Sequence, residues 1–200
     1  MDAIQVMMSE HEQILRVLEA LDCFAAAVHD TLGDKLELGH FVEYADERHH
    51  GKEEHVLFEA MIRNGFPPEQ GPVGMMLFEH QQMRELISVL RGLAEQDAPW
   101  SSTDRERVSD AARSYTGMLR EHIMKENEML YPMAVEHLPP HVQDEVLLST
   151  RGQGSASVDR ECAALDERRA SAGTDATVEK LASHLVARYA HRPRGSGDIR

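Results

Sequence analysis

Apolar residues, with one histidine among them, recur along the start of the chain in alternating steps of four and three. This spacing keeps the side chains on one face of an α-helix, as in helices that pack on a core. We therefore predict an amphipathic helix over residues 2–31 that ends near Gly33. The positions on its apolar face are Met7, His11, Ile14, Leu18, Leu21, Ala25 and Val28.

Three further segments have the same periodicity. The second covers about 35–63 and ends before Gly65 and Pro67, since glycine and proline cannot continue a helix. The third covers about 72–96. Four long helices joined by short connections predict an all-α protein with an antiparallel up-down four-helix bundle.

The fourth helix has recognisable signals at both ends. Thr103 and Glu106 match the Thr-x-x-Glu pattern of a capping box, which predicts that the helix begins there. It continues to the two prolines at 139–140, where it must stop.

The periodicity weakens after these prolines. We predict one short helix over 141–148, another over 174–189 and a disordered tail over 191–200. The chain therefore divides into a four-helix domain, residues 1–138, and a partly helical C-terminal extension, residues 139–200.

The composition agrees with helices packed on helices, and the charge argues against some classes of binding partner. Aromatic residues make up only 5% of the chain, whereas there are 11 methionines. A net charge of −14 argues against a nucleic-acid or membrane partner. Cys23 and Cys162 form no disulfide framework or zinc motif, and no signal peptide or apolar run of ~18 residues is present. We expect a soluble, cytoplasmic protein.

The chain also resembles itself. Glu10-His11-Glu12-Gln13 recurs 69 residues later as Glu79-His80-Gln81-Gln82. The segment 49–58 recurs 73 residues later as 122–131, with His, Lys, Glu, Leu and an aromatic residue coinciding. Two helical hairpins related by an approximate twofold axis would each supply one histidine from the first helix and His-x-x-x-Glu from the second.

The repeated residues form a chelating set. His49 with Glu53, and His122 with Glu126, are i, i+4 pairs that lie on one helix face. Burying the carboxylates without compensation would be costly, and two cations bridged by them would remove that cost. An imidazole–carboxylate set suits iron, with manganese as the alternative. The predicted metal ligands are His11, His49, Glu53, His80, His122 and Glu126.

The sequence leaves two points open at this site. His50 with Glu54 is also an i, i+4 pair, turned ~100° around the helix. The repeat selects His49 over His50, so we expect His50 either to support a ligand or to be an extra one, and its loss to matter less. A single core histidine is usually only hydrogen bonded, and it is the matched repeat that favours metal over a metal-free structural bundle.

These features resemble the hemerythrin-like, HHE cation-binding family over about residues 1–138. The matching features are Glu10-His11, His49-x-x-x-Glu53, Glu79-His80 and His122-x-x-x-Glu126 followed by Leu130-Tyr131-Pro132. The resemblance implies a four-helix bundle with a non-haem di-iron site. It also implies that the same six residues are the ligands and that the carboxylates bridge the two irons.

Arg84 departs from the family's oxygen carriers, which have a second histidine four residues after the position of His80. We expect the iron nearest the third helix to lack one nitrogen ligand, which argues against simple reversible oxygen carriage. The predicted function is reaction with, or sensing of, O₂, peroxide or nitric oxide. If the protein is an enzyme, it is a di-iron oxidoreductase.

Two other functions fit the same residues. The protein could donate iron for repair without turnover of its own. It could instead be a metal-dependent regulatory module, in which metal binding is linked to folding and residues 139–200 contact a protein partner.

Overall fold

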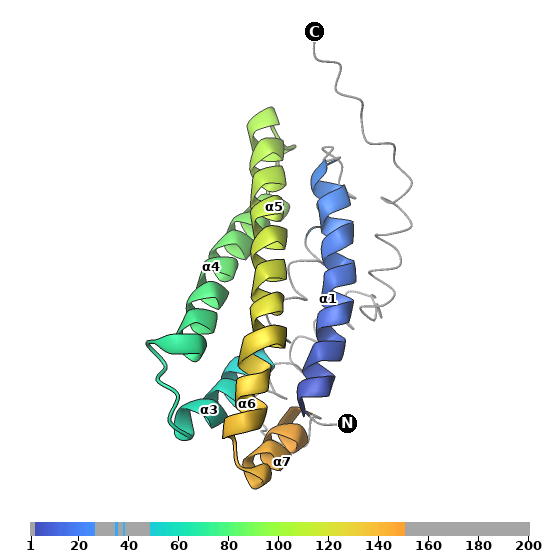
Figure 1. Cartoon of the computed structure of the whole chain (residues 1–200). Helices are drawn as coiled ribbons and strands as arrows, with labels where there is room; N and C mark the ends of the chain where they lie inside the picture. The colour runs from blue at the N-terminus through green and yellow to red at the C-terminus, as the bar shows by residue number, and fades with distance from the viewer. Residues whose placement is uncertain (1–2, 27–34, 36–37, 39–48, 151–200) are drawn as a thin grey trace.

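The computed structural model describes residues 3–26, 35, 38 and 49–150. Every regular element in these ranges is helical, and the long helices α1, α4 and α5 run side by side (Figure 1). The all-α bundle predicted from the sequence is therefore confirmed. The elements are α1 (Ala3–Ala26), η2 (Glu53–Phe58), α3 (Glu59–Arg63), α4 (Gly71–Ala94), α5 (Ser102–Lys125), η3 (Glu126–Leu130), α6 (Tyr131–His137) and α7 (Pro140–Leu148).

The helices pack as antiparallel neighbours. α4 and α5 form a hairpin, and α1 packs along the other side of α5. The second predicted helix is helical from residue 49 through η2 and α3, while its predicted start at 35 lies in the part that is mostly outside the described residues. The third predicted helix, 72–96, corresponds to α4.

Two π-helical segments interrupt the long helices at equivalent places. η2 begins at Glu53 and η3 begins at Glu126, the two glutamates of the repeat. The residues that flank η3 keep helical backbone angles, so α5, η3 and α6 form one continuous helix. Short π-helical turns are frequent at functional sites, because the extra residue changes which side chains face inward.

The start of α5 differs from the sequence prediction. The N-cap is Ser101 and not Thr103. The Ser101 hydroxyl accepts a hydrogen bond from the Asp104 amide at 3.1 Å, and the Asp104 carboxylate accepts one from the Ser101 amide at 3.0 Å. Aspartate at the third helical position completes the capping box as glutamate would. The capping box predicted over 103–106 was therefore wrong by two residues.

The core consists of two apolar clusters with a polar layer between them. We call the cluster that contains Met7 the lower cluster and the cluster that contains Ile14 the upper cluster. On α1, the buried His11 lies between these two residues. α4 repeats this order around His80. The bundle therefore interrupts its own core at one level, and apolar side chains shield that level from water on both sides.

The described part of the C-terminal extension packs on the bundle. The predicted helix 141–148 is present as α7, which lies beneath α1 in Figure 1. Its residues Val142 and Val146 are buried in the lower cluster. The predicted helix 174–189 and the tail lie outside the described residues. None of the described helices combines the length and the apolar character that crossing a membrane requires.

We predict that Ser101→Ala lowers the thermal midpoint of unfolding by about 2–4 °C, because it leaves the Asp104 amide at the start of α5 without its acceptor. Thr103→Ala is the matched control, since Thr103 is exposed within the first turn of the same helix. Circular dichroism during heating measures both variants. Equal shifts would show that Ser101 does not act as the cap.

Candidate metal centre

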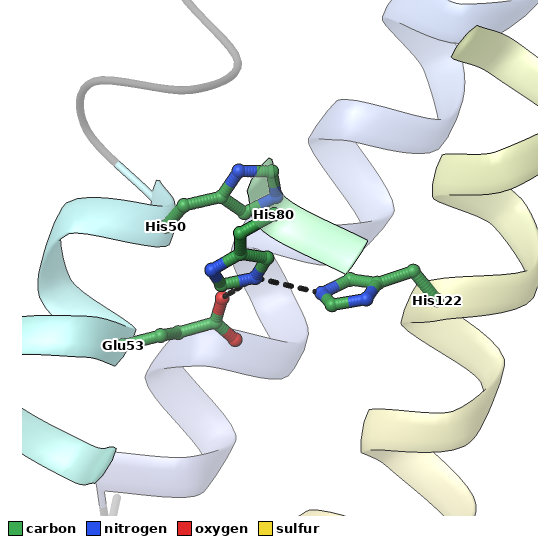
Figure 2. Close-up of side chains that lie close together, drawn as sticks. All are labelled: His50, Glu53, His80 and His122. Carbon is green, nitrogen blue, oxygen red and sulfur yellow. Dashed lines mark hydrogen bonds and ion pairs between the residues drawn. The ribbon is translucent and has the colours of Figure 1, made fainter. Parts of the chain in front are cut away.

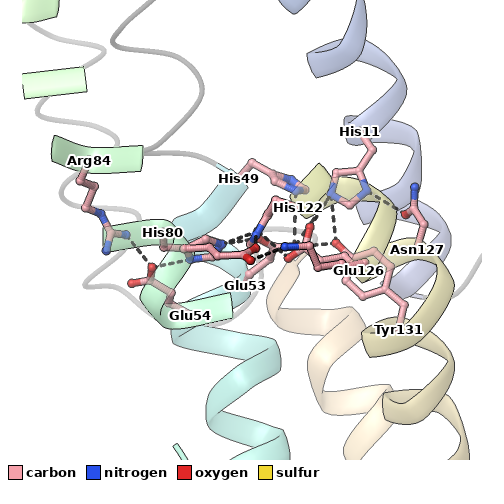
Figure 3. Close-up of polar contacts among 12 residues, drawn as sticks. His11, His49, Glu53, Glu54, His80, Arg84, His122, Glu126, Asn127 and Tyr131 are labelled. Atoms are coloured by element: carbon pink, nitrogen blue, oxygen red, sulfur yellow. Dashed lines mark hydrogen bonds and ion pairs between the residues drawn. The ribbon is translucent and has the colours of Figure 1, made fainter. Parts of the chain in front are cut away.

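The six predicted side chains converge in the polar layer between the clusters. They come from α1, from the second helix, whose described part starts at 49, from α4 and from the continuous α5–η3 helix, and Figure 3 shows them meeting at one level. His11 is 1% exposed, His49 is 3% exposed, and the other four are fully buried. The structure thus brings together His11, His49, Glu53, His80, His122 and Glu126.

The two carboxylates reach across the bundle in a repeated pattern. Glu53 lies 3.4 Å from Nε2 of His49 through one oxygen and 3.5 Å from Nε2 of His80 through the other. Glu126 lies 3.0 Å from Nε2 of His122 and 3.2 Å from Nε2 of His11. Each glutamate therefore contacts the histidine of its own helix and the lone histidine of the other hairpin.

His50 is a seventh member of this set. It is fully buried, and its ring stacks on that of His80 with centroids 4.0 Å apart (Figure 2). Donor atoms within 4.8 Å of one another define two groups, which share Glu53. The first group is His50, Glu53, His80 and His122, and the second is His11, His49, Glu53 and Glu126.

The position of His50 changes the expectation, drawn from Arg84, that the metal nearest the third helix lacks one nitrogen ligand. Arg84 does not turn toward the cluster, and its guanidinium donates to Glu54 at 2.6 Å (Figure 3). His50 supplies the third imidazole beside His80 and His122 that Arg84 cannot supply. The group with only two imidazoles is the one that contains His11 and His49.

The buried polar atoms fit the demands of bound cations. No partner in hydrogen-bonding geometry reaches Nε2 of His49, one oxygen of Glu53 or either oxygen of Glu126, although all are buried. Such atoms are costly in a dry interior unless a ligand or ion satisfies them. Nε2 of His80 and Nε2 of His122 also approach to 2.9 Å, as two nitrogens aimed at one position would.

Burial controls the protonation of the metal-free site. Desolvation lowers the pKa of His49 to about 4 and that of His80 to about 3, so both imidazoles are neutral at pH 7 and can bind a metal. Desolvation and the nearby Glu126 charge raise the pKa of Glu53 well above its usual range. Burial alone would lower the pKa of His122, but the nearby Glu126 carboxylate and the hydrogen-bonded Glu79 carboxylate outweigh burial and raise it to about 9. A metal would therefore displace protons as it binds.

Behind the cluster, each of four histidines directs Nδ1 at a side-chain oxygen on a neighbouring helix. We call the four residues that supply these oxygens the outer acceptors. Nδ1–H is the donor whenever Nε2 faces a metal. The acceptors are Glu10 for His49 at 3.0 Å, Glu54 for His80 at 2.7 Å, Glu79 for His122 at 2.8 Å and Asn127 for His11 at 2.9 Å.

An aromatic ring flanks each lone histidine. Tyr131 stacks on His11 with centroids 5.4 Å apart, and Phe58 stacks on His80 with centroids 5.6 Å apart. Tyr131 and Phe58 are equivalent in the repeat, but only Tyr131 carries a hydroxyl. This hydroxyl donates to Glu53 at 2.6 Å and lies 3.3 Å from Nε2 of His11. The two sides of the site therefore differ in polarity.

The sequence contained signals for the residues that the repeat alone did not select. His50 stands next to a predicted ligand and is spaced as a chelate with Glu54. Tyr131 stands where the other half of the repeat has phenylalanine, and Asn127 stands where it has Glu54. Positions at which a repeat breaks its own pattern were the available signal.

The comparisons with known proteins agree with this site. Residues 2–134 match the family described as the hemerythrin HHE cation binding domain. A relative from Salmonella schwarzengrund (strain CVM19633), the iron-sulfur cluster repair protein YtfE, is 31% identical over 90 residues. The match covers 44% of this chain and 40% of the relative, so the chain spans less than half of that protein's length. No solved structure matches.

We predict that His50→Ala reduces metal content as much as His49→Ala does, because both imidazoles are buried members of a donor group. His55→Ala is the matched control, since His55 is exposed on the same helix. Metal analysis of the purified variants measures the effect. Full metal retention in His50→Ala would return His50 to the supporting role that the repeat suggests.

Proposed function

Because the chain belongs to the hemerythrin HHE cation-binding family, we propose that it is a non-haem di-iron protein that reacts with or senses O₂, peroxide or nitric oxide. The family match and the two donor groups support bound metal. The identity of the metal as iron, the number of ions and the small ligand are parts of the proposal. Manganese suits the same donors and is the alternative.

The observation that carries the proposal is a buried layer of seven donors divided into two groups that share a carboxylate. A single ion would leave several of the seven donors without a partner. In the proposed centre, His50, His80 and His122 would hold one ion and His11, His49 and Glu126 the other, with Glu53 belonging to both donor groups. Bound iron supplies one-electron chemistry and open coordination positions for small ligands.

The protein's own residues make the two sides of this centre unequal. The His11 side has two imidazoles, and the position equivalent to His50 on that side is Ile123, an apolar residue. We propose that the small ligand binds on this side, where coordination is incomplete. The Tyr131 hydroxyl lies there and can turn its single proton from Glu53 to a bound ligand, while the two apolar clusters exclude bulk water.

A repair or iron-donor function is the second candidate, and the similarity to an iron-sulfur cluster repair protein favours it. Iron transfer from the loaded protein to a metal-free iron–sulfur protein would distinguish it from ligand reaction. A metal-dependent interaction module is the third candidate. It predicts partner binding that depends on metal and on residues 139–200, without turnover of peroxide, O₂ or nitric oxide.

We predict that the chain binds two iron ions and that removing them lowers the thermal midpoint by about 5–10 °C, because ions that bind only the folded state stabilise it. Iron analysis and differential scanning calorimetry of loaded and stripped protein measure both quantities. A stoichiometry near zero after anaerobic loading would contradict the proposal. One ion per chain would support a single metal position instead.

We predict that the ferrous protein binds nitric oxide and that Tyr131→Phe speeds release of the bound molecule about tenfold, the effect of losing one hydrogen bond of ~1.4 kcal/mol. Stopped-flow absorption spectroscopy measures the release rate. Tyr115→Phe is the control, since Tyr115 is another buried tyrosine, in the upper cluster. An unchanged rate in Tyr131→Phe would place the ligand away from this side.

A further inference from the structure

The outer acceptors link all four helices in a closed ring. The Glu10–His49 bond runs from α1 to the second helix, and each following bond runs to the next helix until Asn127 of η3 returns to His11 of α1. Three of the four outer acceptors are carboxylates. Asn127 is the exception, because its acceptor is an uncharged amide oxygen.

The exception extends to the surrounding charges. Each carboxylate in the ring has a cationic partner: Glu10 contacts Lys52, Glu79 contacts Lys125 and Glu54 contacts Arg84. Asn127 corresponds to Glu54 in the repeat, and the position that corresponds to Arg84 is Leu15, which packs on the upper cluster.

The repeat has therefore replaced a charged pair, Glu54 with Arg84, by a neutral pair, Asn127 with Leu15. This replacement also accounts for Arg84, which departs from the family's oxygen carriers. Arg84 neutralises the acceptor behind His80, because its guanidinium donates to the same Glu54 oxygen that faces Nδ1 of His80.

The nature of the acceptor sets the donor strength of a metal-bound imidazole. A carboxylate that accepts Nδ1–H pulls the proton away and makes Nε2 more basic, whereas an amide oxygen does so weakly. His49, His80 and His122 have the strong arrangement and His11 has the weak one. His11 also belongs to the donor group with only two imidazoles.

We propose that Asn127 is a positioning residue that keeps His11 the weakest imidazole donor of the centre. As a consequence, the ion held by His11 and His49 is released first and has the higher reduction potential. The inference rests on the proposed metal centre. It adds an order of release and reduction that follows from this chain's own residues.

The test compares Asn127→Asp with wild type, since aspartate keeps the size of asparagine and replaces its amide by a carboxylate. Both proteins are loaded anaerobically with ferrous iron and mixed with an excess of a ferrous chelator. Wild type should release iron in two phases, because the two groups differ in imidazole number as well. In Asn127→Asp the fast phase should slow by about tenfold or more.

A second readout is the midpoint potential of the first one-electron reduction of the oxidised protein. It should fall in Asn127→Asp, since a more basic His11 stabilises the oxidised ion. Gln81→Glu is the control, because it adds the same charge at an exposed position next to His80. Equal effects of Gln81→Glu and Asn127→Asp would overturn the proposal by showing a general effect of charge.

The reciprocal variant keeps the proposal testable if Asn127→Asp fails to bind two ions. Glu54→Gln gives His80 the neutral acceptor that His11 has, and it should speed the slow phase of release. An unchanged slow phase would overturn the proposal. Wild-type protein that binds no metal would instead refute the proposed function itself, whereas two ions with release rates unaffected by Asn127→Asp refute only the role of Asn127.

Discussion

The fold depends on one constraint: seven titratable side chains are buried in a layer between two apolar clusters. A bundle of this size could close its core with apolar residues alone, and it gives up that stability at one level of every helix. Carboxylates and imidazoles in such a layer are costly unless something of opposite charge joins them. Bound cations would meet the requirement, with donors supplied by all four helices.

The twofold repeat explains why the hairpins need each other. Each glutamate contacts a histidine of the opposite hairpin, so neither hairpin completes a donor group alone. Departures from the repeat then give the two sides different chemistry. His50 corresponds to Ile123 in the repeat, so the His11 side has one imidazole fewer. Tyr131 corresponds to Phe58, so only the His11 side has a hydroxyl.

Helical periodicity and the repeat predicted the bundle and its six central side chains, because both patterns identify the residues on the buried face of each helix. They could not rank His49 against His50, since neighbouring residues lie ~100° apart on an ideal helix and both can face inward where a helix is distorted. Ser101 was missed as the N-cap because several residues nearby can cap. The sequence showed only that Arg84 cannot replace a histidine ligand. Its pairing with Glu54 could not be predicted, because it depends on a contact between two helices.

The π-helical segments carry a consequence for insertions and deletions. One segment begins at Glu53 and the other at Glu126, and each holds one residue more than an α-helix would need for the same turn. Removing one residue from η3 would restore regular α-helical winding and leave the helix after it on the same faces, whereas removing one residue from α5 would rotate everything after the cut by ~100°. In the second case Tyr131 and Ala134, both buried, would turn away from the lower cluster together. The length of these helices, counted to the single residue, is therefore as much a part of the site as the ligands are.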